Sequence, residues 1–346
     1  MTATIEADRP SLLLRVTQSR RVQSLTILGL FVVIFLVFAI ARPDAFLSQT
    51  NIEGIGLSAS QVLILGAGVT FLLIAGGLDL SVGAIIVFSA VVAAKIMAAA
   101  SAGLEGADRM GWPLWGPVLI GALAGIAAGA LWGIFNGTVI VRTGIPPFIA
   151  TLASMTVILG LAQVWTDGLN VSGAPSELQT AFGLGRMFGI IPWPIVIAAI
   201  VVAVLWVVLA NTRFGLRLYA IGANPESARR AGINVGRYTV GVYALVGALA
   251  GLVAVIDVAR FTTATVNGYS AVALNVITAV VIGGTSLWGG RGGMGGTVVG
   301  SLIPATLTSG FVILGLQPFW QNVAVGIVLL LAVSVDQYRR RKLSAS

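Results

Sequence analysis

The chain has 346 residues, of which 57% are hydrophobic and only 9% are charged. A soluble domain carries about 25% charged residues, so this composition indicates an integral membrane protein. Cysteine and histidine are absent, which excludes disulfides, thiol chemistry and the commonest general base and transition-metal ligand. The net charge of +8 is explained by arginines in predicted cytoplasmic loops, so we predict no nucleic-acid partner.

The first apolar run begins after several arginines and extends over about residues 25–41. A cleaved signal peptide has an apolar region of about 7–15 residues, which is shorter than this run. We therefore expect a first membrane span with a cytoplasmic N-terminus. Removal of the run remains the alternative, because Ala39-Ile40-Ala41 resembles a cleavage site.

About 20 apolar residues are needed to cross a hydrocarbon core of about 30 Å, and by this measure the chain predicts an all-α polytopic membrane fold with about ten transmembrane helices. The expected spans are 24–41, 55–75, 81–100, 114–140, 147–165, 192–211, 238–256, 271–286, 294–315 and 319–335. The expected organisation is a cytoplasmic segment at 1–23, a transmembrane domain at 24–337 with a polar loop at 212–237, and a basic cytoplasmic tail at 338–346.

The distribution of charge predicts the orientation. With the N-terminus inside, most of the 20 basic residues fall on cytoplasmic segments, as the positive-inside rule requires. An even number of spans then places the C-terminus inside as well. Acidic residues fall mainly in the loops on the opposite side, to which we also assign Asp257 and Glu53.

Glycine patterns predict packing. Gly121, Gly125, Gly129, Gly133 and Gly137 recur every fourth residue, which puts them on one helix face. Such a face lets another helix approach closely in lipid. In the longest outside loop, residues 175–183 have the pattern of a short surface helix. Two segments, 76–80 and 283–287, are loosely alike and hint at duplicated halves.

Enzymatic chemistry has little support. A P-loop needs a lysine after glycine, whereas Lys95 follows alanine and Lys342 follows arginine. The GxGxxG spacing within residues 289–296 reflects abundant glycine and follows no predicted strand. We therefore predict no catalytic residue, no cofactor and no metal site.

Polar residues within the expected spans are candidates for a translocation pathway. Asp79 and Lys95 are the only ionisable ones we assign to spans, whereas ion-coupled transporters usually need intramembrane carboxylates. Asp79 can be a gate or the cap of a helix start, and Lys95 can snorkel to the interface. The pathway candidates are Gln61, Asp79, Asn136, Thr151 and Asn275; the alternative role for each is hydrogen bonding between helices.

The polar stretch at 212–238 is not explained by membrane spans. It holds five arginines and a single acid, and it contains a short helix with well-defined ends. Asn224 can cap the first turn, Pro225 suits the first helical position, and Gly232 can stop the helix. We predict that a soluble partner binds here, although a solvated basic loop is the alternative. The candidate residues are Asn224, Pro225, Glu226, Ser227, Arg229, Arg230 and Gly232.

Four segments together carry a family resemblance. They are IAGGLDLSVGAII at 74–86, GTVIVRTGIPPFIATLASM at 137–155, TRFGLRLYAIGANPESARRAGI at 212–233 and AVVIGGTSLWGGRGGMGGTVVGSLI at 279–303. In this order they resemble the permease subunits of ribose-type carbohydrate ABC importers of bacteria, and the resemblance covers most of the chain.

This resemblance implies a sugar permease of the bacterial inner membrane that does not itself hydrolyse ATP. It implies separate ATPase subunits on the cytoplasmic side, a periplasmic sugar-binding protein, and a second permease chain that is usually identical. The helix at 224–231 would be the coupling helix that enters a groove of the ATPase.

Three other functions stay open at this point. The related branched-chain amino-acid permeases share parts of the same pattern. An ion-coupled secondary transporter is disfavoured by the scarcity of intramembrane carboxylates. A non-transporting membrane scaffold is disfavoured by the glycine-faced, interrupted helices.

Overall fold

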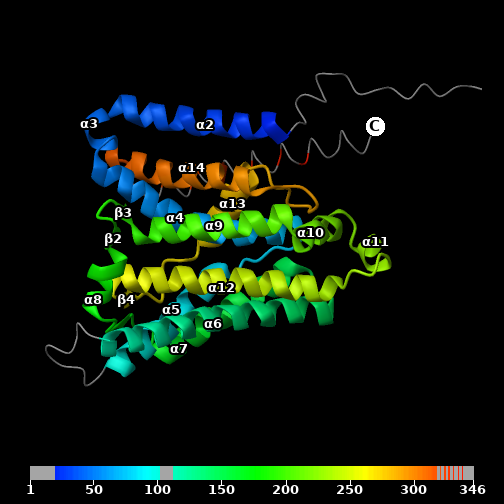
Figure 1. The fold of residues 1–346 in the computed structure, drawn as a ribbon, viewed down its shortest axis with the longest axis horizontal. Coiled ribbons are helices and arrows are strands. Elements are labelled where there is room, and N and C mark those ends of the chain that lie inside the picture. Colours follow the sequence, from blue (N-terminus) through cyan, green and yellow to red (C-terminus); the bar gives the residue numbers. More distant parts are fainter. Residues whose placement is uncertain are drawn as a thin grey trace, which may run out of the picture.

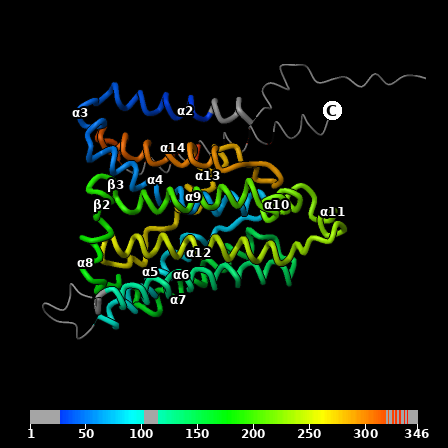
Figure 2. The backbone as a smooth tube through the Cα atoms, in the orientation of Figure 1, coloured from blue at the N-terminus to red at the C-terminus, as the bar shows by residue number. Residues whose placement is uncertain are grey.

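The computed structural model describes residues 20–101 and 112–317, with isolated helical positions between 320 and 337. Most of the expected segment 1–23, most of the expected span 319–335 and the tail 338–346 lie outside the described residues. The long helices run roughly along one common direction (Figure 1). Helices α10 and α11 lie at one end of this bundle, and α3, α8 and the short strands lie at the other (Figure 2).

The described elements are almost all helical. The helices are α2 Arg20–Ala41, α3 Pro43–Phe46, α4 Gln49–Ile74, α5 Val82–Ser101, α6 Trp112–Thr143, α7 Pro147–Thr166, α8 Ser176–Leu178, α9 Trp193–Asn211, α10 Arg213–Ala223, α11 Pro225–Arg230, α12 Val235–Phe261, α13 Val272–Ile282 and α14 Met294–Ile313, with a π-helix η2 at Gln179–Gly183. The strands are β1 Val171–Ser172, β2 Arg186–Met187, β3 Ile191–Pro192 and β4 Thr263–Ala264.

Seven of the described helices, namely α4, α5, α6, α7, α9, α12 and α14, are long and apolar enough to cross a membrane. Two shorter apolar helices are the Ile27–Ala41 part of α2 and the whole of α13. With 11 residues, α13 is about 16 Å long, about half of a hydrocarbon core. The all-α polytopic membrane fold is confirmed, whereas the count of about ten crossings remains a prediction.

Two helices, α4 and α13, end just before the two sequence motifs that look alike. After α4, Gly76 has φ +80, and the backbone N–H groups of Gly76 and Gly77 donate to the carbonyls of Leu73 and Leu72. After α13, Gly284 has φ +87, and Gly284 and Thr285 donate to Val281 and Val280 in the same way. This is the Schellman pattern, in which a left-handed glycine closes the helix. The two motifs are therefore equivalent helix stops.

The glycine face of α6 packs against α12, as the spacing predicts. A Cβ on Gly129 would lie 2.2 Å from the Gly247 carbonyl oxygen, and one on Gly133 would lie 2.1 Å from that of Tyr243. Only glycine allows the two backbones to come this close. The α14 glycines at 296 and 300 approach α13 in the same manner. These glycines thus hold the bundle together.

The end of the bundle with the strands is closed by short elements. Strand β1 pairs antiparallel with β4, with Val171 opposite Ala264 and Ser172 opposite Thr263. Strand β2 pairs with β3. The expected surface helix at 175–183 is present as α8 and η2, and its last residue, Gly183, abuts the carbonyl of Ala259 in α12.

Candidate functional site

Helix α11 has both predicted caps. The side-chain oxygen of Asn224 accepts hydrogen bonds from the backbone N–H groups of Glu226 and Ser227, each at 3.0 Å. Pro225 occupies the first helical position, where no donor is needed. At the other end Gly232 has φ +81, and its N–H donates to the Arg229 carbonyl at 2.9 Å. The six-residue helix is therefore held at both ends by local contacts.

One side of α11 is fixed to the protein and the other is open. Ala228 is 4% exposed and packs in a small apolar cluster with Ile221 and Val235. On the outer side, Glu226 forms ion pairs with Arg229 at 3.5 Å and with Arg230 at 3.4 Å, and all three side chains are at least 60% exposed. Exposed pairs of this kind contribute little to stability. The charged side chains of α11 are therefore available to a partner.

Helix α10 seats this loop on the ends of the membrane helices. Phe214 stacks on Tyr238 with ring centroids 5.2 Å apart, and the Arg217 guanidinium donates to the Tyr238 hydroxyl at 2.7 Å. A Cβ on Gly222 would lie 1.7 Å from the carbonyl oxygen of Ile74, the last residue of α4. These contacts join α10 to α12 and α4. Sequence reasoning missed them because the residues are far apart in the chain.

A first polar cluster lies where α5 begins. Asp79 Oδ1 accepts hydrogen bonds from the Ser81 N–H at 2.8 Å and from the Ser81 hydroxyl at 2.5 Å. The Asn136 amide donates to the Ser81 hydroxyl at 2.8 Å, and the Leu80 N–H donates to the Thr151 hydroxyl at 3.2 Å. Three predicted pathway residues, Asp79, Asn136 and Thr151, therefore meet here.

Asp79 contacts the backbone just before α5. Its side chain is 2% exposed, and its bonded oxygen holds Ser81 immediately before the first residue of α5. The Tyr243 hydroxyl donates to the neighbouring Leu78 carbonyl at 2.9 Å. Side chains from α6, α7 and α12 therefore make hydrogen bonds to the non-helical segment between α4 and α5. Asp79 Oδ1 thus makes the backbone contact expected of a cap, while its buried Oδ2 has no hydrogen-bond partner among the described residues, so the choice between cap and gate stays a prediction.

A second polar cluster surrounds Asp257. We assigned this residue to an outside loop, but α12 continues to Phe261 and Asp257 is 3% exposed within it. The expectation that Asp79 and Lys95 are the only ionisable residues in spans is therefore wrong. Asp257 accepts hydrogen bonds from the Gln61 amide and from the Tyr269 hydroxyl, the latter at 2.7 Å. Burial of this carboxylate is tolerated because both of its oxygens have hydrogen-bond donors.

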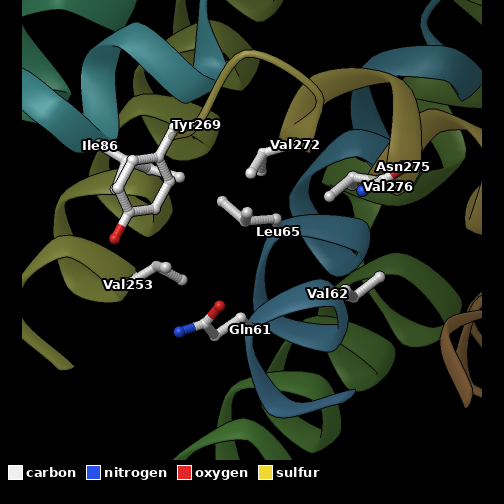
Figure 3. Close-up of a pocket in the computed structure, with 9 residues that line it drawn as sticks. All are labelled: Gln61, Val62, Leu65, Ile86, Val253, Tyr269, Val272, Asn275 and Val276. Carbon is white, nitrogen blue, oxygen red and sulfur yellow. The ribbon is translucent and has the colours of Figure 1, made fainter. Parts of the chain in front are cut away.

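A cavity of about 120 Å³ adjoins this cluster (Figure 3). It is lined by Gln61, Val62, Leu65, Ile86, Val253, Tyr269, Val272, Asn275 and Val276. The predicted pathway residues Gln61 and Asn275 thus share this cavity, while Asp79, Asn136 and Thr151 do not line it. The five candidates fall in two separate places. Lys95 belongs to neither polar cluster. Its Nζ lies over the Trp165 ring, 5.3 Å from the ring centre.

The comparison with known protein families agrees with this architecture. The family model described as "Branched-chain amino acid transport system / permease component" matches residues 51–333. The chain belongs to this permease family. The match includes both polar clusters and the α10–α11 loop.

Several relatives of this permease are similar over nearly their whole length. The ribose import permease protein of Bacillus subtilis is 39% identical over 90% of this chain and 91% of its own. The ribose import permease protein of Escherichia coli strain K12 is 34% identical over 94% of this chain and 96% of its own. The D-allose transport system permease protein of the same strain is 33% identical over 88% of this chain and 89% of its own. No solved structure matches the permease.

Proposed function

We propose that this permease is the transmembrane subunit of a binding-protein-dependent ABC importer for a monosaccharide, such as ribose or a related sugar. The observation that carries the proposal is the capped, exposed helix α11, which packs through Ala228 on Ile221 of α10 and Val235 of α12. A helix of this kind suits a soluble motor protein, and relatives similar in sequence over most of the chain are named as sugar permeases.

A neutral substrate fits the interior better than an amino acid. None of the residues that line the cavity is charged, and they combine two amides, one phenol ring and aliphatic side chains. An amino acid carries an ammonium and a carboxylate, which lose hydration inside a protein unless each meets an opposite charge. A sugar needs only hydrogen bonds and apolar contact. This favours a sugar over the substrate class in the family description.

The proposed partners follow from the position of α11. Two ATPase subunits bind α11 from the cytoplasm, a periplasmic sugar-binding protein docks at the β1–β4 end, and a second copy of the permease completes the pathway in the bacterial inner membrane. Both termini are cytoplasmic, with the transmembrane domain at 24–337 and the coupling loop at 212–237. Closure of the ATPases acts on α11, and transport is driven because the partners contact the two states of the bundle differently.

Reconstitution tests this proposal. Other relatives are named as galactose and fructose import permeases. Vesicles that contain the permease with its ATPase and its sugar-binding protein should therefore take up ribose, allose, galactose or fructose when ATP is supplied. Uptake should persist when proton and sodium gradients are collapsed. Uptake by the permease alone, driven by a gradient, would instead establish an ion-coupled transporter that uses the buried Asp257.

A further inference from the structure

The carboxylate of Asp257 is buried, belongs to neither α11 nor the α5 cap, and connects three elements. Its Oδ1 accepts from the Gln61 amide of α4, and its Oδ2 accepts from the hydroxyl of Tyr269, which precedes α13. Asp257 itself does not line the cavity, whereas Gln61 and Tyr269 do. The carboxylate therefore stands behind the wall of the cavity and fixes two of its side chains.

This arrangement decides which groups face the cavity. Because the amide nitrogen of Gln61 is bound to Asp257, its carbonyl oxygen points into the space between Val253, Leu65 and Tyr269 (Figure 3). The Tyr269 hydroxyl is directed away from that space toward Asp257, which leaves the ring beside the cavity. A few fixed polar groups on a mostly apolar wall are typical of a small-molecule site.

The cavity carries no charge on its wall, and its volume is small. Both carboxylate oxygens are used by Gln61 and Tyr269, so the lining of the cavity carries no charged side chain. The volume of about 120 Å³ is close to that of an engineered apolar cavity of about 150 Å³ that binds benzene. The space is therefore of the size of one small ring.

We propose that this cavity is a transient site for a neutral hydroxylated ring on the translocation route, and that Asp257 is a positioning residue for it. The Gln61 carbonyl accepts a hydrogen bond from a solute hydroxyl, and the Tyr269 ring and the valines contact the carbon face of the solute. This inference rests on the proposed function, because it names the place where the transported sugar is held inside the permease.

Single-cysteine labelling tests the site directly, because the chain contains no cysteine. Val253→Cys and Val272→Cys place a thiol on the cavity wall, and Ser172→Cys places one on the exposed β1 strand as the control. The permease is assembled with its ATPase and binding protein, and a water-soluble thiol reagent is added during ATP turnover. The sugar used is whichever of ribose, allose, galactose and fructose is taken up. That sugar should slow labelling several-fold at both cavity positions and leave Ser172→Cys unaffected.

The outcomes separate the site from the function. Uptake of a sugar without protection of either cavity cysteine overturns the site and leaves the proposed function intact. Cavity cysteines that never react also overturn it, because a solute route must admit water. If none of the four sugars is taken up, the proposed function fails and the site assignment fails with it.

Asp257→Asn tests the positioning role. The new amide has one acceptor oxygen and one NH2 donor: if the NH2 faces Gln61, the Gln61 amide must flip, and if it faces Tyr269, the hydroxyl must accept instead of donate. The variant also removes the negative charge that strengthens both bonds. We expect the amount of sugar moved per ATP hydrolysed to fall several-fold, while ATPase activity and the yield of assembled complex stay the same. Glu53→Gln is the matched control, because Glu53 pairs with Arg186 at 2.9 Å outside the cavity. Unchanged coupling in Asp257→Asn, or an equal loss of coupling in Glu53→Gln, would overturn the assignment.

Discussion

Removal of the Asn224 cap should weaken the ATPase complex through the helix that it stabilises. Helix α11 has six residues, whereas isolated helices shorter than about 12 residues are marginal in water. Asn224→Ala removes both 3.0 Å hydrogen bonds at the start of α11. Loss of such a cap costs about 1 kcal/mol, and where binding requires the formed helix this corresponds to about a fivefold loss of affinity.

The assay is the affinity of the ATPase subunits for the permease in lipid nanodiscs, measured together with ATP-driven uptake. Asn224→Ser is the matched control, because serine also places a side-chain oxygen at the cap and is about as effective as asparagine there. We expect the alanine variant to bind about fivefold more weakly, as the loss of about 1 kcal/mol requires. The serine variant should remain close to the wild type.

Two results would refute this reasoning. If the alanine variant binds as tightly as the wild type, α11 does not depend on its cap, and the ATPase does not require the formed helix. If alanine and serine weaken binding equally, the amide of Asn224 contacts the ATPase itself. Its hydrogen bonds to Glu226 and Ser227 would then be incidental to coupling.

Three further substitutions test other parts of the argument. Arg230→Glu turns the ion pair with Glu226 into a repulsion and reverses a charge on the open face of α11; ATPase co-purification and uptake should fall while membrane insertion, followed by protease accessibility, is unchanged. Gly133→Val forces α6 away from the Tyr243 carbonyl and should lower thermal stability by about 1–3 kcal/mol, whereas Gly160→Ala, with nothing within 4 Å, should not. Asp79→Asn keeps an oxygen for Ser81 and should retain most ATP-driven uptake; its loss would show that the charge of Asp79 is needed for transport.

The features that sequence reasoning predicted correctly are local or strictly periodic. The caps of α11 depend on residues within a few positions of each other, so the identity of Asn224, Pro225 and Gly232 is enough to place them. The glycine face of α6 follows from a repeat of four on a helix. In both cases the physical cause can be read within one element.

The features that sequence reasoning missed depend on contacts between distant elements. Asp257 looked like the start of an outside loop because an isolated carboxylate is costly in a membrane helix. Its donors are Gln61, 196 positions earlier, and Tyr269, which follows the helix. The sequence held one signal, because apolar Val258 and Ala259 follow Asp257. Both residues are buried in the structure.

The half-length of α13 shows a different limit. Hydropathy alone predicts a crossing over 271–286, but the helix stops at Ile282 because Gly284 adopts a left-handed conformation. The same motif follows Ile74, where the 26 residues of α4 are already enough to cross a membrane, so the expected span and the helix end nearly together. Hydropathy counts apolar residues, whereas the ends of these helices are set by backbone conformation.

The end of α4, the loop after α13 and the loop at 212–237 meet at one place, and this connects α10 and α11 to the helices that carry Gln61 and Asn275. The Gly290 N–H donates to the Ile74 carbonyl at 2.9 Å, and Gly222 of α10 packs against both groups. Ile74 ends the helix that carries Gln61, and Gly290 lies in the loop after the helix that carries Asn275. Gly222 has no free space toward either group, so movement of α10 in that direction acts on the end of α4 and on the loop after α13 together. Because Phe214 and Arg217 also bind α10 to Tyr238 of α12, such a movement reaches the helices that carry Gln61, Asn275 and Val253.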